Sequence, residues 1–240
     1  MIFKTSEVFK TSEVYTYQTQ NMNQIRYLLG LLLLIALCWQ YPIFYPLKIL
    51  VVFFHESSHA LATLLTGGSV KELVINPEQG GHVVFEDGNA FVIYSAGYLG
   101  SLIWGVIIYL SSVKTHYDQY IMTALGIIII AITLLFGRNL FSWVFGIMTG
   151  AIMLWVAKKL SEQINDFILR LIGLVNMSYV PLDIYSDTIE RSYLQSDAYF
   201  LSQTIFGTTL MWGILWLIIS LIVIIYCLKW SVVQYNLSKK

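Results

Sequence analysis

His55, Glu56 and His59 are the residues whose types and spacing best fit catalytic chemistry in this sequence. They belong to the segment His55-Glu56-Ser57-Ser58-His59, an H-E-x-x-H motif. Residues four apart lie on the same face of a helix, so both imidazoles can bind one zinc ion. The glutamate then lies beside the open coordination position, where it can act as a general base for water. The motif predicts a Zn²⁺-dependent hydrolase with His55 and His59 as metal ligands and Glu56 as a catalytic residue.

The motif lies within an apolar run. Residues 49–54 before it and 60–65 after it are almost entirely apolar, and the first polar break is Gly67-Gly68. A helix that begins near Leu47 places His55 about 12 Å along its axis, inside a bilayer core about 30 Å thick. Ionisable groups at that depth are costly and are usually functional.

Catalytic zinc takes three protein ligands, so the chain must supply one more. His82 and His116 have suitable side chains, but they lie in polar segments that we expect in water or at the membrane interface. Asp183 and Asp187 are four residues apart, hence on one helical face, and Asp183 follows an apolar run and a proline. The residues alone favour Asp183 and leave Asp187 open as an alternative.

The composition determines which elements must position these residues. The chain has 240 residues, of which 57% are hydrophobic and 12% charged, and its mean hydropathy is +0.69. These values exclude a soluble domain and predict a multi-pass integral membrane protein in a lipid bilayer. The formal net charge is zero, so nothing indicates a nucleic-acid partner.

Apolar segments separated by polar ones predict an all-α membrane protein with six or seven transmembrane helices. Two β-prone runs, 70–76 and 82–86, flank a turn at 77–81 and predict a small β-hairpin after the H-E-x-x-H helix. Residues 183–197 form an unusually polar stretch before the last span. The expected spans are 27–45, 47–66, 91–110, 120–136, 140–156 and 205–228, with the segment around Asp183 as the uncertain seventh.

The polar ends flank a single membrane domain. We expect residues 1–25, which repeat FKTSEV twice, to be a disordered tail, residues 26–230 to form one polytopic domain, and residues 231–240 to form a polar tail. Lysine and arginine residues near both ends favour a cytoplasmic location for each, which requires an even number of spans. Gly97, Ser101 and Gly105 recur every four residues and predict close helix packing.

With these motifs in place, the sequence resembles the site-2 protease family of intramembrane zinc metallopeptidases, in its short form without a PDZ domain. That family pairs H-E-x-x-H with a later N-x-x-P-x-x-P-L-D-G segment whose aspartate is the third zinc ligand. Asn176, Pro181, Leu182 and Asp183 match this segment, whereas Tyr179 and Ile184 depart from it. The resemblance implies that Asp183 is the third ligand, with Asp187 as its substitute.

The resemblance extends to residues 96–100, a glycine-rich stretch, and to the hairpin at 67–87, which resembles a β-element thought to grip substrate as an added strand. It implies an endopeptidase that cleaves a membrane-spanning or membrane-associated protein. Asn176 is the candidate second catalytic residue, as a hydrogen-bond donor to the oxyanion or the substrate backbone. The alternative role for Asn176 is to cap a broken helix.

Other functions remain open on the sequence. A different membrane zincin, of the type that trims prenylated substrates, would use a glutamate such as Glu162 or Glu190 as the third ligand. A catalytically silent scaffold would keep the fold and bind a membrane partner, but it would not need the base Glu56. A metal transporter is disfavoured because the apolar parts of the spans carry no other His, Asp or Glu.

Overall fold

A computed structural model of the chain describes residues 25–237, with side chains described up to residue 232. The tail expected over residues 1–25 therefore lies almost entirely outside the described part, as do residues 238–240. A first helix covers Ile25–Cys38. The further elements are η1 (Pro42–Phe44), α2 (Tyr45–Leu65), β1 (Ser69–Asn76), β2 (Gly80–Glu86), α3 (Ala90–Lys114), α4 (Asp118–Phe136), α5 (Leu140–Lys159), α6 (Glu162–Tyr185), η2 (Ser186–Glu190), α7 (Asp197–Thr204) and α8 (Thr209–Leu237).

Helices long and apolar enough to cross a bilayer make up most of the described chain. The helices α3, α4, α5 and α8 and the continuous segment Glu162–Glu190 give five candidate spans, and a bent pair formed by Ile25–Cys38 and Pro42–Leu65 raises the number to six. The prediction of a multi-pass helical membrane protein is confirmed. The last helix, α8, continues to Leu237.

The expected separate span at 27–45 is replaced by the first arm of this bent pair. Its helix ends at Cys38, before a 3-10 turn that begins at Pro42, and the chain bends by 114° between the two arms. An arm of this length is about 21 Å long, shorter than the bilayer core of about 30 Å. The described residues therefore provide six spans at most, and the segment around Asp183 continues as a helix rather than as a re-entrant loop.

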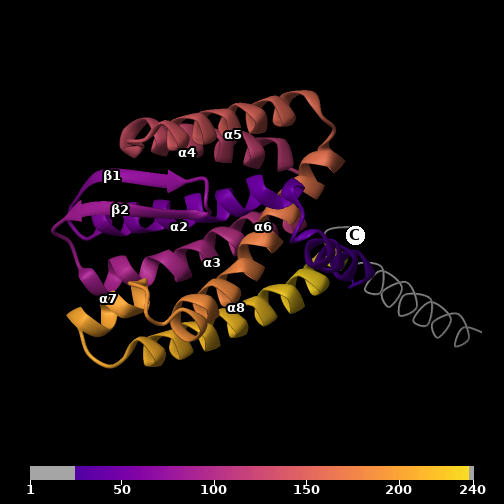
Figure 1. Cartoon of the computed structure of the whole chain (residues 1–240). Coiled ribbons are helices and arrows are strands. Elements are labelled where there is room, and N and C mark those ends of the chain that lie inside the picture. The colour runs from indigo at the N-terminus through magenta and orange to yellow at the C-terminus, as the bar shows by residue number, and fades with distance from the viewer. Residues whose placement is uncertain (1–24, 238–240) are drawn as a thin grey trace, which may run out of the picture.

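The β-hairpin is present where the sequence predicts it. β1 and β2 pair antiparallel, with Leu73 opposite Val83 and Ile75 opposite Gly81. Leu73 and Ile75 are fully buried in a core cluster shared with α2. Figure 1 shows the hairpin alongside α2, with α4 and α5 beyond β1.

Helices α3 and α6 lie on the other side of α2, and α8 lies beyond them (Figure 1). Small residues allow α3 and α6 to approach closely. A Cβ atom added at Gly105 would lie 3.0 Å from the Gly173 carbonyl oxygen, and one added at Gly173 would lie 2.9 Å from the Gly105 carbonyl oxygen. The expected small-residue face of α3 is therefore a helix-packing face.

Candidate metal centre

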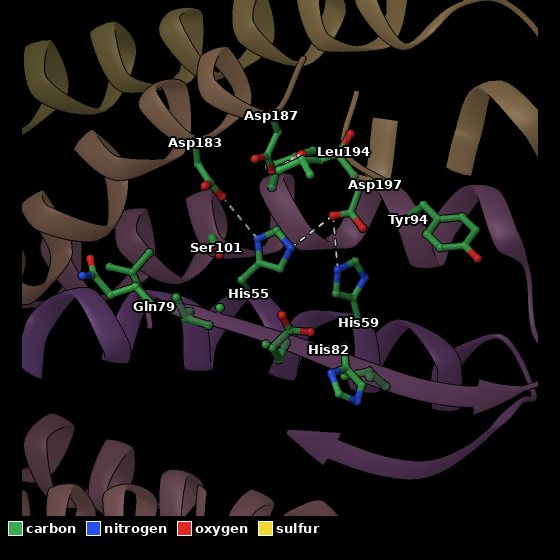
Figure 2. Close-up of a pocket in the computed structure, with 18 of the residues that line it drawn as sticks. His55, His59, Gln79, His82, Tyr94, Ser101, Asp183, Asp187, Leu194 and Asp197 are labelled. Atoms are coloured by element: carbon green, nitrogen blue, oxygen red, sulfur yellow. Dashed lines mark hydrogen bonds and ion pairs between the residues drawn. The ribbon is translucent and has the colours of Figure 1, made fainter. Parts of the chain in front are cut away.

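The two histidines of the H-E-x-x-H motif lie in the middle of α2 and point to the same side (Figure 2). The Nδ1 atom of His59 is 2.8 Å from the Ile93 carbonyl oxygen. A carbonyl can only accept a hydrogen bond, so Nδ1 of His59 carries the proton and donates. This tautomer leaves the Nε2 lone pair of His59 free for a metal ion.

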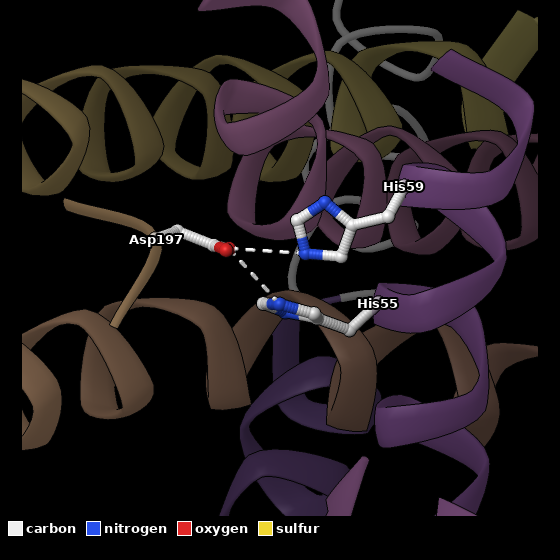
Figure 3. A group of neighbouring side chains, drawn as sticks. All are labelled: His55, His59 and Asp197. Carbon is white, nitrogen blue, oxygen red and sulfur yellow. Dashed lines mark ion pairs between the residues drawn. The ribbon is translucent and has the colours of Figure 1, made fainter. Parts of the chain in front are cut away.

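Asp197, the first residue of α7, reaches both histidines (Figure 3). Its Oδ2 atom is 3.1 Å from His55 Nε2 and 3.2 Å from His59 Nε2. The Ser196 hydroxyl caps α7 by accepting a hydrogen bond from the Tyr199 amide, which fixes the helix start at the aspartate. Within the described chain, His55, His59 and Asp197 form the one group of three His, Cys, Asp or Glu side chains close enough to hold a single ion.

The geometry of this cluster fits a metal ion better than a hydrogen-bonded triad. The Asp197 Oδ2 atom is buried and makes no hydrogen bond of acceptable angle, despite its short distances to both imidazoles. Burial alone would raise the pKa of Asp197, but the imidazoles of His59 and His55 hold this pKa well below its usual range. Two imidazole nitrogens and an ionised carboxylate are a typical ligand set for catalytic zinc.

Gly97 of α3 forms the opposite wall of the cluster. A Cβ atom added there would lie 2.6 Å from His59 Nε2 and would also collide with His55 Nε2 and Asp197 Oδ2. The three candidate ligand atoms therefore converge on a space that only a glycine on α3 leaves open.

Glu56 lies beside this space in a cavity of about 460 Å³ that contains all three ligand residues. Its side chain is buried, and β2 covers it closely, because a Cβ atom added at Gly81 would lie 2.8 Å from Glu56 Cγ and Oε1. The hairpin forms one wall of the cavity, and α6 with the connection to α7 forms another (Figure 2).

The structure places the predicted third ligand outside the three-residue cluster. The Asp183 Oδ2 atom is 3.9 Å from His55 Nδ1, the ring nitrogen opposite the one that faces Asp197. Asp187 accepts a hydrogen bond from the Tyr98 hydroxyl at 2.9 Å and pairs with Arg191 at 3.0 Å. Both carboxylates line the cavity, but neither joins the two Nε2 atoms.

The other candidates lie further from the cluster. Asn176 is fully buried, and its amide donates to the Ser101 carbonyl of α3 at 2.8 Å, outside the set of residues that line the cavity. Glu162 and Glu190 do not line the cavity either. His82 lines it from β2 but is paired with Glu72 at 3.6 Å, and His116 lies in the α3–α4 connection.

Sequence reasoning did not select Asp197. It ends the polar stretch at 183–197, and its only local signal is a Ser-Asp pair at the start of a short helix, which is typical of a helix N-cap. Its proximity to His55 and His59 follows from packing between distant segments of the chain.

An H-E-x-x-H helix, a converging aspartate and a buried glutamate, surrounded by apolar helices, define a multi-pass membrane protein with a His-His-Asp centre. The sequence profile of the Peptidase M50B-like family matches residues 28–227, so the chain belongs to this family. The match confirms the resemblance to the site-2 protease type of intramembrane metallopeptidase. Comparisons with curated proteins and with solved structures give no match.

Proposed function

We propose that this protein is a zinc-dependent intramembrane endopeptidase in which His55 Nε2, His59 Nε2 and an Asp197 carboxylate oxygen bind the metal. The observation that supports this assignment most directly is the convergence of these three atoms beside Glu56 in one cavity. A zinc ion held there would polarise the scissile carbonyl and acidify a water molecule.

Glu56 is the general base in this proposal. It directly follows the proposed ligand His55 in α2, and it lines the same cavity. It would take a proton from the attacking water and pass it to the leaving amine, a role that contributes about 10²- to 10⁴-fold in rate.

Asp183 is assigned a positioning role instead of a ligand role. A carboxylate near the second ring nitrogen of a metal-binding histidine orients the ring and fixes its tautomer. The Asp183 Oδ2 atom is 3.9 Å from His55 Nδ1, which is beyond hydrogen-bond distance, so we assign it an influence on the ring through its charge.

The substrate class follows from the location of the cavity among membrane spans. A transmembrane helix must unwind before cleavage, because its backbone groups are bonded internally and would otherwise be unsatisfied in lipid. In the described sheet, β2 pairs with β1 alone, and β2 lines the cavity. The unwound substrate can bind as an added strand at the free edge of β2.

Zinc content tests the ligand set. We expect about one zinc per chain in the detergent-purified wild type, loss of zinc in H55A and D197N, and retention in D183N. Retention in D197N together with loss in D183N would instead support the aspartate of the P-L-D motif. A well-folded wild type that binds no zinc would refute the hydrolase proposal and favour a scaffold.

Cleavage tests the reaction. The zinc-loaded protein is incubated with a panel of membrane-spanning peptides in detergent micelles, and the products are identified by mass spectrometry. We expect E56Q to keep its zinc and to lose cleavage, because only the base is removed. Equal cleavage by E56Q and wild type would contradict the role of Glu56.

A further inference from the structure

The connection between α4 and α5 contacts the outer edge of β1. Leu73 and Gly137 form a parallel bridge, and the Arg138 amide donates to the Leu73 carbonyl at 3.3 Å. In Figure 1, α4 and α5 lie on the β1 side of the hairpin, whereas the cavity is lined by β2.

Two side chains at the start of α5 satisfy both backbone groups of Ile75 in β1. The Ile75 amide donates to Ser142 Oγ at 2.7 Å, and its carbonyl accepts from Asn139 Nδ2 at 2.8 Å. Ile75 is fully buried and Ser142 is almost so. Loss of either partner would leave a buried backbone group unpaired, which is unfavourable away from water.

Asn139 links the helix to the strand with one side chain. Its Oδ1 atom accepts a hydrogen bond from the Ser142 amide at 2.9 Å and thereby caps α5. Its Nδ2 atom donates to Ile75 at the same time. These two hydrogen bonds of Asn139 therefore fix the position of the outer edge of the hairpin relative to the start of α5.

The pairing of β1 with β2 connects this contact at Ile75 to Glu56, the proposed base. Ile75 lies directly opposite Gly81 in the strand pairing. Gly81 is the residue whose backbone lies against Glu56. A shift of β1 at Ile75 moves Gly81, and with it the wall beside Glu56 and the free edge of β2.

We infer that Asn139 and Ser142 are positioning residues that hold the hairpin over the catalytic centre from its outer edge. The contacts are independent of the reaction, whereas the effect on cleavage rests on the proposed function. Helices α4 and α5 thus support the hairpin beside the site, although no residue of either helix lines the cavity.

The variant N139D separates the two bonds of Asn139. Aspartate keeps the acceptor that caps α5 but cannot donate to the Ile75 carbonyl when ionised. S142A removes the acceptor for the Ile75 amide. The matched control is N89D, because Asn89 caps α3 through Oδ1 with the Val92 amide and makes the same chemical change at another helix start.

The measurement is hydrogen–deuterium exchange of the full-length, zinc-loaded protein in detergent. We expect residues 72–86 to exchange roughly three- to tenfold faster in N139D and S142A, as loss of one hydrogen bond predicts, and not in N89D. Zinc content stays at the wild-type value, while cleavage of the membrane-spanning peptides falls.

Unchanged exchange over residues 72–86 in both variants would overturn the inference. Faster exchange spread equally over α2 to α8 would also overturn it, since that pattern shows general destabilisation. Faster hairpin exchange with wild-type cleavage would refute the link to the reaction. If the wild type cleaves none of the peptides, the proposed function fails, but the exchange result still decides whether these residues hold the hairpin.

Discussion

The two ring nitrogens of His55 face different carboxylates, and this difference underlies the roles proposed for Asp197 as a metal ligand and for Asp183 as a positioning residue. Nε2 faces Asp197 at 3.1 Å, and Nδ1 faces Asp183 at 3.9 Å. The two ring nitrogens of His59 also have different partners. Nδ1 donates a hydrogen bond to the Ile93 carbonyl, and Nε2 faces Asp197. At the scale of single residues, the proposed site thus has two Nε2 atoms that face Asp197, with a carbonyl or a carboxylate near the Nδ1 atom of each ring.

Gly97 provides a test of this geometry. In G97A, the methyl group would occupy the space between the three proposed ligand atoms, so we expect loss of zinc from a protein that still folds. The control is G30A, where an added Cβ atom has nothing within 4 Å and zinc content stays at the wild-type value. Metal analysis of both purified variants checks the prediction, and a full complement of zinc in G97A would contradict it.

The variant N176A tests whether Asn176 of α6 takes part in catalysis or only in helix packing. In N176A, the hydrogen bond to the Ser101 carbonyl is lost and a small buried cavity remains. We expect a loss of about 1–3 kcal/mol in the free energy of unfolding in detergent. Zinc content and cleavage by the folded fraction stay unchanged. Wild-type stability with lost cleavage would instead establish the oxyanion role.

At the scale of elements, the hairpin is held between two partners. Its outer edge contacts the start of α5, and its inner face contacts α2. Gly81 lies at the closest approach to Glu56, while its neighbour Gly80 has nothing within 4 Å of an added Cβ atom. Adjacent glycines therefore differ in whether a side chain is tolerated.

This difference gives a matched pair of variants. In G81A, the methyl group would displace Glu56 or push β2 away from α2, and we expect the cleavage rate to fall by up to about 10²- to 10⁴-fold, the contribution of a general base. Zinc stays bound, because the ligands do not touch Gly81. G80A should cleave like the wild type. Equal rates of peptide cleavage for G81A and G80A would argue against control of Glu56 by the strand.

At the scale of the whole molecule, five candidate spans follow the bent pair, and the last of them, α8, ends on the side where α2 begins (Figure 1). Five of the described basic residues lie on that side, at the start of α2 and at the ends of α3, α5 and α8. By the positive-inside rule, we predict that this side is cytoplasmic. The residues concerned are Lys48, Lys114, Lys158, Lys159 and Lys229.

Cysteine labelling in intact cells tests this topology. Tyr117 lies between α3 and α4, Phe206 lies between α7 and α8, and both side chains are exposed. In a C38A/C227A background, we expect a membrane-impermeant thiol reagent added outside to label F206C but to label Y117C only after the membrane is opened. Labelling of both from outside would show that the membrane crosses the chain differently.

The sequence by itself determines the features that depend on local patterns. Spacing of four residues places His55 and His59 on one helical face, and apolar runs identify the spans. The turn at 77–81 between β-prone runs identifies the hairpin. Each of these follows from residues that are neighbours in the chain, so it can be read without knowledge of the fold.

Only the tertiary structure brings together residues from distant elements. Asp183 lies in the motif that the family resemblance favours, yet packing of α6 and α7 against α3 places Asp197 at the two Nε2 atoms. The same holds for Asn139, whose contact with Ile75 joins a helix start to a strand far away in the sequence. No spacing rule encodes such contacts, because they depend on how apolar helix faces bury one another and not on the separation of residues along the chain.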